Sequence, residues 1–223
     1  AIGIAMLISL AIMIGSFRQT VVDWARQTLV ADLWMRPATS DAGSRGARFQ
    51  PDMENKLNSV VGVKAVEPWT ETDFEYGGLK ATLGAARFDL VEKYSNLSYL
   101  SGRGNAEVAR SIHGDRCIIS ESFSIKHRVK RGDTIRIPMQ FKSVDLLVED
   151  IYYDYVNDSG YVVIDRELYE NNMDDRSINS FAIFLEDGAD AQKVRKEQEC
   201  YESCRFPRCV NGGQTWLCKS SSR

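Results

Sequence analysis

The stretch Asp115–Asp165, DRCIISESFSIKHRVKRGDTIRIPMQFKSVDLLVEDIYYDYVNDSGYVVID, carries the clearest succession of strand, turn and short-helix patterns in this 223-residue chain. Its first apolar run, Cys117–Ser120, predicts a strand. Ser120 is a favourable N-cap residue and predicts a short helix over 121–127. The same stretch predicts three more strands, over 134–137, 144–155 and 161–164, and structural turns at Gly132, Asp133 and Gly160.

Strand and helix patterns also follow one another irregularly on both sides of this stretch. Upstream, the patterns predict strands over 31–37, 63–69 and 74–76, a short helix over 51–57 and a hairpin strand over 79–88. Downstream, they predict a short helix over 165–171, a strand over 178–185 and a last helix from 189 to 196. Because strict βαβ alternation is absent, the fold class is predicted to be α+β.

The chain opens on AIGIAMLISLAIMIGSF, residues 1–17, which contain no charge. This length approaches the roughly 20 apolar residues that a helix needs to cross a bilayer. The first turn is expected to be missing, so the chain is interpreted as a fragment of a larger membrane protein. A signal peptide and a buried core helix are the alternatives. The signal peptide is disfavoured because neither a basic region nor a small-residue cleavage site flanks the run.

The apolar pattern continues beyond the expected span. It keeps one helix face apolar and predicts a stalk helix over residues 18–30 that leads out of the membrane. This face is the candidate surface for transmitting movement between membrane and domain. Its residues are Phe17, Val21, Trp24, Ala25 and Thr28.

Composition and motifs exclude several classes of function. The net charge is −3 and no basic stripe is visible, so nucleic acid is not an expected partner. The chain lacks a phosphate-binding loop of the G-x-x-x-x-G-K-[ST] type. His113 is expected in an exposed turn, and His127 at a basic helix end where positive charge suits the helix dipole. No catalytic, cofactor or metal site is therefore predicted, and the chain is not expected to be an enzyme.

The order of motifs in the central stretch resembles the extracytoplasmic core domain of FtsX-like, MacB-like ABC transporter permeases. The matching elements are Ser120-Glu121 before a short helix, the turn Gly132-Asp133, and the strands Val148–Ile151 and Val163–Asp165. The chain departs from that family at Glu149 or Asp150, where the family usually has glycine. The resemblance covers roughly residues 1–196.

The resemblance implies a core domain over residues 31–196, with a βαβ-like subdomain and a small β-rich subdomain on a helical stalk. It implies a place on the extracytoplasmic side of the plasma (inner) membrane, and no cofactor in this chain, because ATP is bound by a separate ABC ATPase subunit. Besides that subunit, the expected partners are membrane lipid, a second permease in a dimer, and a periplasmic adaptor or lipoprotein.

The leading hypothesis for function is a permease subunit whose extracytoplasmic domain couples cytoplasmic ATP hydrolysis to export or extraction of a hydrophobic cargo, or to activation of a partner protein. The alternative is the ligand-sensing ectodomain of a membrane signalling receptor, since it too would follow one membrane helix. A membrane-tethered hydrolase is disfavoured because no nucleophile and base are visible.

The last part of the chain, residues 197–223, has a different composition. It is rich in Cys, Ser, Arg and Gly, and helical periodicity is lost. We interpret it as the product of a reading-frame shift near residue 196, or as disordered. Two disulfides or a metal site are the alternatives, although the spacing is not that of C-x2-C pairs. Its cysteines are Cys200, Cys204, Cys209 and Cys218.

Overall fold

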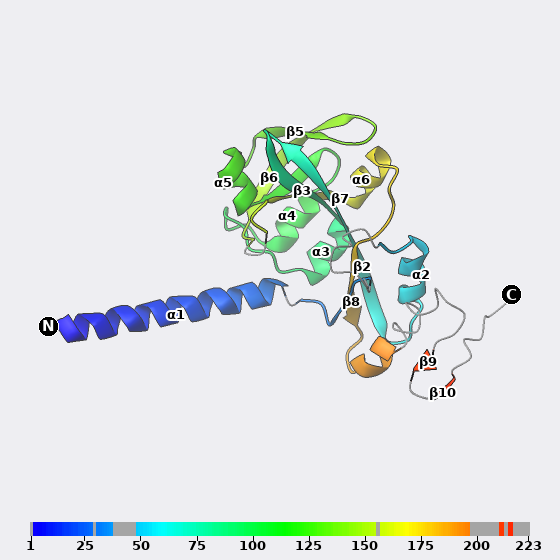
Figure 1. The fold of residues 1–223 in the computed structure, drawn as a ribbon, viewed down its shortest axis with the longest axis horizontal. Helices are drawn as coiled ribbons and strands as arrows, with labels where there is room; N and C mark the ends of the chain where they lie inside the picture. The colour runs from blue at the N-terminus through cyan, green and yellow to red at the C-terminus, as the bar shows by residue number, and fades with distance from the viewer. Residues whose placement is uncertain are drawn as a thin grey trace. The chain divides into compact units, whose positions relative to one another are not determined.

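The computed structural model describes residues 2–28, 30–37, 48–154, 157–196, 210–211 and 214–215 (Figure 1). The chain divides into two compact units. The first, here called the central unit, comprises Trp69–Arg176, with the N-terminal segment Ala1–Ala31 grouped to it. The second, here called the flanking unit, comprises Asp32–Pro68 and Ser177–Arg223. Each unit is described by itself.

The N-terminal segment is one helix, α1 (Ile2–Thr28), drawn in blue in Figure 1. Within it, the 20 residues Gly3–Val22 are long and apolar enough to cross a membrane, and none of that window is buried. This candidate span reaches Val22, five residues beyond the end predicted from the uncharged run. The difference arises because Arg18 alone does not end the apolar character of the helix.

The flanking unit is a small α+β layer. Its strands are β1 (Leu33–Met35), β8 (Ser180–Leu185) and the first part of β2 (Val63–Tyr76), in the order β1-β8-β2. Helix α2 (Asp52–Asn58) begins with acidic residues, which suit the helix dipole, and residues 191–196 form a further helical turn. The core is made of apolar side chains from these elements: Met35, Phe49, Leu57, Val66, Ile178, Phe181 and Ile183.

The central unit is built on a mixed sheet. Its strand order is β2-β3-β7-β4-β6-β5, in which β3–β7 and β4–β6 are parallel pairs and the other neighbours are antiparallel. The strands beyond β2 are β3 (Leu79–Ala86), β4 (Arg116–Ser120), β5 (Thr134–Pro138), β6 (Ser143–Tyr152) and β7 (Tyr161–Asp165).

Four short helices cover this sheet: α3 (Phe88–Tyr94), α4 (Asn105–Ser111), α5 (Glu121–His127) and α6 (Arg166–Asn172). Side chains alternate along β4, so that Cys117 and Ile119 join one core while Ile118 joins the other. The first core receives Phe123 of α5 and Tyr169 of α6, and the second receives the apolar faces of α3 and α4. The sheet of the central unit is therefore buried on both faces.

Ser120 begins α5 as the sequence predicts. Its buried Oγ accepts the N–H of Phe123 at 3.2 Å, which is the N-cap bond, and also the N–H of Tyr161 at 2.8 Å. One hydroxyl thus caps a helix and joins it to the neighbouring strand β7.

We expect Ser120→Ala to lower the free energy of unfolding by about 2–3 kcal/mol, because it leaves two amide groups without an acceptor in the protein interior. Urea titration of the purified protein measures this. The control is Ser59→Ala, whose exposed hydroxyl donates only to the carbonyl of Lys56 and whose loss should change stability by less than about 0.5 kcal/mol. Equal effects of the two substitutions would contradict the double role of Ser120.

Several predicted element boundaries need correction. β2 is one strand over Val63–Tyr76, where the sequence predicted two, because the polar residues 70–73 between them pair with β3 in unbroken register. β6 ends at Tyr152 rather than at 155, a residue outside the described part of the chain. In the tail, Val210–Asn211 and Gln214–Thr215 pair as β9 and β10, and the cysteines at 200, 204, 209 and 218 lie outside the described residues.

Candidate functional site

The predicted coupling face lies along α1. At 100° per residue, Phe17, Val21, Trp24, Ala25 and Thr28 fall within an arc of about 100° on one side of the helix. Phe17 is 71% exposed and Val21 42% exposed, so no other described residue buries these two apolar side chains. The side chains of Trp24 and Thr28 lie outside the described ones. The exposed part of the face, at Phe17 and Val21, is available to lipid or another apolar surface.

The predicted turn residues occupy backbone conformations that explain their identity. Gly132 has a φ of +87° and donates its N–H to the carbonyl of Val148 at 2.8 Å. Asp133 closes the same turn, since its carboxylate accepts the N–H of Lys130 at 2.7 Å. Gly160 has a φ of +88°, in the left-handed region that favours glycine.

Strand β6 contains a bulge at the position where the chain departs from the glycine expected there. Opposite β4, Cys117 pairs with Val148 while Ile118 pairs with Asp150, so Glu149 is the extra residue. A bulge shifts the alternation of side chains by one position. Val148 and Ile151 therefore face the same core, and Glu149 and Asp150 reach the same group of cations.

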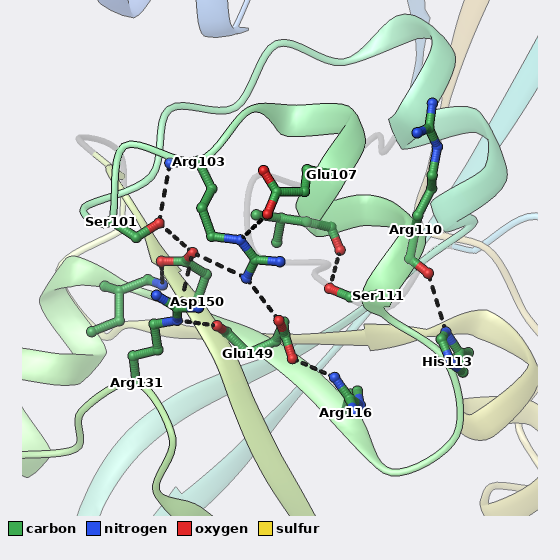
Figure 2. A network of polar contacts seen from close by, with 12 residues as sticks. Ser101, Arg103, Glu107, Arg110, Ser111, His113, Arg116, Arg131, Glu149 and Asp150 are labelled. Carbon is green, nitrogen blue, oxygen red and sulfur yellow. Dashed lines mark hydrogen bonds and ion pairs between the residues drawn. The ribbon is translucent and has the colours of Figure 1, made fainter.

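That group is a polar network, shown in Figure 2, whose centre is Arg103. Its guanidinium donates to Glu149 at 2.7 Å and to Glu107 at 2.7 Å, and lies 3.7 Å from the carboxylate of Asp150. Arg103 belongs to the loop before α4, whereas both acidic residues of the bulge belong to β6. The network therefore ties this loop to the strand.

Two further arginines complete the network. Arg116 of β4 donates to the second oxygen of Glu149 at 2.6 Å. Arg131 donates to the backbone carbonyl of Glu149 at 3.0 Å and lies 4.0 Å from the carboxylate of Asp150. We call the six charged residues the bulge network: Arg103, Glu107, Arg116, Arg131, Glu149 and Asp150.

Asp150 is the most enclosed member of the bulge network, with 1% of its side chain exposed. Its carboxylate accepts the hydroxyl of Ser101 at 2.5 Å and the N–H of Ile151 at 2.8 Å. A buried carboxylate needs such donors, since an uncompensated charge in the interior is costly. The loop residue Ser101 and the arginines together meet this need.

Charge compensation also sets the ionisation of Glu149. Burial acts to raise its pKa, but the hydrogen bond from Arg103 and the charges of Arg116 and Arg103 outweigh burial, so the pKa of Glu149 lies below its ordinary value. The hydrogen bonds to Glu149 and Glu107 raise the pKa of Arg103. These six residues hold three positive and three negative charges, so the bulge network is neutral as a whole.

Comparison with known families decides what kind of domain this is. The model of the MacB-like periplasmic core domain family matches residues 1–199, which is most of the chain. The chain belongs to this family. The predicted resemblance to the extracytoplasmic domain of ABC transporter permeases is confirmed.

One curated protein and two solved structures are similar to this chain. An ABC transporter permease protein of Mycobacterium tuberculosis, described as uncharacterised, is 22% identical over 191 residues. That alignment covers 84% of this chain but 22% of the relative, so the chain spans about a fifth of the length of the curated protein it matches.

The other two similar proteins are solved structures. The periplasmic region of MacB from Actinobacillus actinomycetemcomitans has a TM-score of 0.52 and 17% identity, covering 77% of this chain and 82% of that one. The extracellular domain of YknZ, a noncanonical ABC-type transporter from Gram-positive bacteria, gives a TM-score of 0.46 and 14% identity, covering 73% of this chain and 86% of that one. The match to the MacB region confirms the predicted α+β fold.

Family membership indicates whether this domain carries out catalysis or binds ATP. The MacB-like core domain is non-catalytic, as predicted, and ATP is bound by the ATPase subunit of such a transporter rather than by the permease. It is the periplasmic domain of a membrane permease, preceded here by one apolar helix. Among the described residues of this MacB-like domain, no three His, Cys, Asp or Glu side chains gather to form a metal site.

The two histidines of this MacB-like domain lie apart in different surroundings. His113 is exposed and contacts the carbonyl of Arg110 at 3.2 Å. His127 ends α5 as predicted, but the expected charge on its ring is not supported. Burial, followed by the charge of Lys126, lowers the pKa of His127.

Sequence reasoning missed most of the bulge network. It marked Glu149 and Asp150 as departures from the family, but not the arginines that compensate them. Two acidic residues adjacent in a predicted strand break its apolar alternation, and that was the available signal. Their cationic partners come from positions 18 to 47 residues away, which local patterns do not connect.

Proposed function

We propose that this chain supplies the extracytoplasmic domain, with its membrane helix, of a permease subunit that couples cytoplasmic ATP hydrolysis to movement of a hydrophobic cargo or to activation of a partner protein. The observation that carries the proposal is the continuity of α1. The helix runs from Ile2 to Thr28, six residues beyond the candidate span that ends at Val22. At 1.5 Å per residue, it extends about 9 Å past the apolar window.

A continuous helix transmits displacement better than a flexible linker. When ATP binding shifts the membrane helices, a rigid α1 carries the shift into the polar region beyond the span. The apolar face from Phe17 to Thr28 gives that movement a surface on which a neighbouring helix can pack. Phe17 and Val21 are exposed among the described residues, as is the rest of the candidate span, so lipid or a neighbouring helix can cover them.

The partners in this proposal are a cytoplasmic ABC ATPase, a second permease and a periplasmic adaptor or lipoprotein, in the plasma (inner) membrane. The residue divisions predicted from the sequence, with a stalk over 18–30 and a core domain over 31–196, belong to the same proposal. The family match favours this transport role over the ligand-sensing receptor considered as the alternative.

The test is Trp24→Ala in the complete transporter with its ATPase subunit, reconstituted in lipid. Trp24 is the largest residue of the predicted coupling face, and truncating it should remove packing without disturbing the core domain. We expect cargo moved per ATP hydrolysed to fall about fivefold or more, which is the usual size of coupling between distant sites.

The matched control is Gln27→Ala, on the polar side of the same helix, which should leave the ratio unchanged. Thermal unfolding should show the same midpoint for both variants. An unchanged ratio in Trp24→Ala would mean that α1 is only an anchor.

A further inference from the structure

Three aromatic rings meet where the tip of the β2–β3 hairpin contacts α5. The ring of His127 lies 4.4 Å from that of Phe123, one helical turn earlier, and 5.0 Å from that of Tyr76 at the end of β2. The rings of Tyr76 and Phe123 are 5.3 Å apart. We call these three residues the ring cluster.

The ring cluster holds the hairpin tip to the helix. Tyr76 pairs with Leu79 across the turn Gly77-Gly78, which makes it the last paired residue of β2. A Cβ atom on Gly77 would lie 3.8 Å from Nδ1 of His127, so the turn backbone is also close to the imidazole. Phe123 is fully buried in the core of the central unit. His127 therefore joins a fixed core residue to the end of a hairpin.

The imidazole is poorly suited to carry a charge in this position. Its Nε2 is buried and, among the described residues, has no hydrogen-bond partner. A neutral ring can place its lone pair there, whereas a protonated ring must place an N–H there without an acceptor, which is costly. The rings of Tyr76 and His127 form a T-shaped contact at 89°. The imidazole cannot turn its Nε2 toward water without losing this contact.

The positive charge of Lys126 also disfavours protonation of the imidazole of His127. Lys126 is the preceding residue on α5, and its ammonium is exposed and donates to the carbonyl of Asp158 at 2.8 Å. On the hairpin, the ionisable group in contact is the phenol of Tyr76. Neither of these neighbours supplies a carboxylate that would stabilise an imidazolium.

We propose that His127 is a pH-responsive latch, neutral when the hairpin tip is docked on α5 and protonated when the tip is released. Release separates the phenol ring of Tyr76 from the imidazole of His127, so that the imidazole can take up a proton. This role does not depend on the coupling proposed for α1.

The direction of the pH effect follows from linkage. The docked state has a lowered pKa for His127, so the released state binds more protons as pH falls below about 6.5, the ordinary value for histidine. Docking is fully favourable above that pH and weakens as pH falls toward the lowered value. One linked proton changes the docking equilibrium by at most about tenfold per pH unit.

The test is hydrogen–deuterium exchange of the whole chain in detergent between pH 8 and pH 5, corrected for the intrinsic pH dependence of exchange. We expect peptides that cover the hairpin tip and α5 to lose protection as pH falls, by up to about tenfold per unit, while strands β4 and β7 keep theirs. His127→Phe retains a ring that does not titrate and should abolish this pH dependence. His113→Gln is the matched control and should behave as the native chain.

A second measurement needs no substitution. The chain has two histidines, so exchange of the imidazole C2 proton can follow each ring separately. We expect His127 to titrate below the ordinary value for histidine, because burial lowers its pKa in the docked state. Titration of His127 at or above the ordinary value for histidine, or the same loss of hairpin protection in His127→Phe, would overturn the proposal.

Discussion

Replacement of Gly160 by alanine is expected to lower the free energy of unfolding by about 3–5 kcal/mol. The backbone of Gly160 has a φ of +88°, which an L-residue adopts only with strain. A Cβ atom there would also lie 2.7 Å from Cα and 2.8 Å from N of Phe123. These are backbone atoms of α5 that cannot move aside as a side chain could. Urea or thermal unfolding of the purified chain measures the loss.

The hairpin glycine Gly78 distinguishes the cost of a positive φ from the cost of the steric clash with α5. Its φ is +79°, but nothing lies within 4 Å of a Cβ added to it. Gly78→Ala should therefore carry only the conformational cost, about 1–2 kcal/mol. If the two variants lose stability equally, the contact between the 157–160 turn and α5 is looser than described.

The second large effect is expected at Arg103. Arg103→Met keeps the length of the side chain but leaves Glu149, 12% exposed, and Asp150, 1% exposed, with less compensation. Breaking a buried ion pair by removing one partner costs about 3–5 kcal/mol. Because Arg103 itself is 20% exposed, we expect a loss of about 2–4 kcal/mol, measured by urea titration.

A double-mutant cycle with Glu149→Gln tests whether the loss comes from charge. The second substitution removes the negative charge that Arg103 faces, so the double variant should be more stable than the sum of the single effects predicts, by about 0.5–3 kcal/mol. Arg87→Met is the control, because its pair with Asp89 is 40% and 54% exposed and should contribute less than about 1 kcal/mol. Strict additivity in the cycle would show that packing, and not charge, explains the role of Arg103.

Local sequence signals predicted the elements that depend on neighbouring residues. Ser120 was identified as the cap of α5 because the cap bond spans three residues. Gly132 and Gly160 were identified as turn residues because left-handed backbone favours glycine wherever it occurs. Apolar runs likewise located β4 and β7, and alternation of polar and apolar residues located β5.

Contacts between distant residues could not be predicted in this way. The close approach of Gly160 to Phe123 depends on how β7 and α5 pack, and the bulge at Glu149 depends on the register between β4 and β6. The meeting of Tyr76 with His127 joins residues 51 positions apart. Each is fixed by tertiary packing, about which local pattern and propensity say nothing.

The bulge network has a consequence for how such domains diverge. Because both acidic residues of the bulge are enclosed and depend on arginines for charge compensation, losing the arginines leaves an unfavourable buried charge, while losing matched members together avoids that state. Substitutions at Arg103, Arg116, Glu149 and Asp150 are then inherited most readily as a set. A lineage that restores a small residue at the bulge is expected to lose the arginines as well, and intermediates with half of the set should be short-lived.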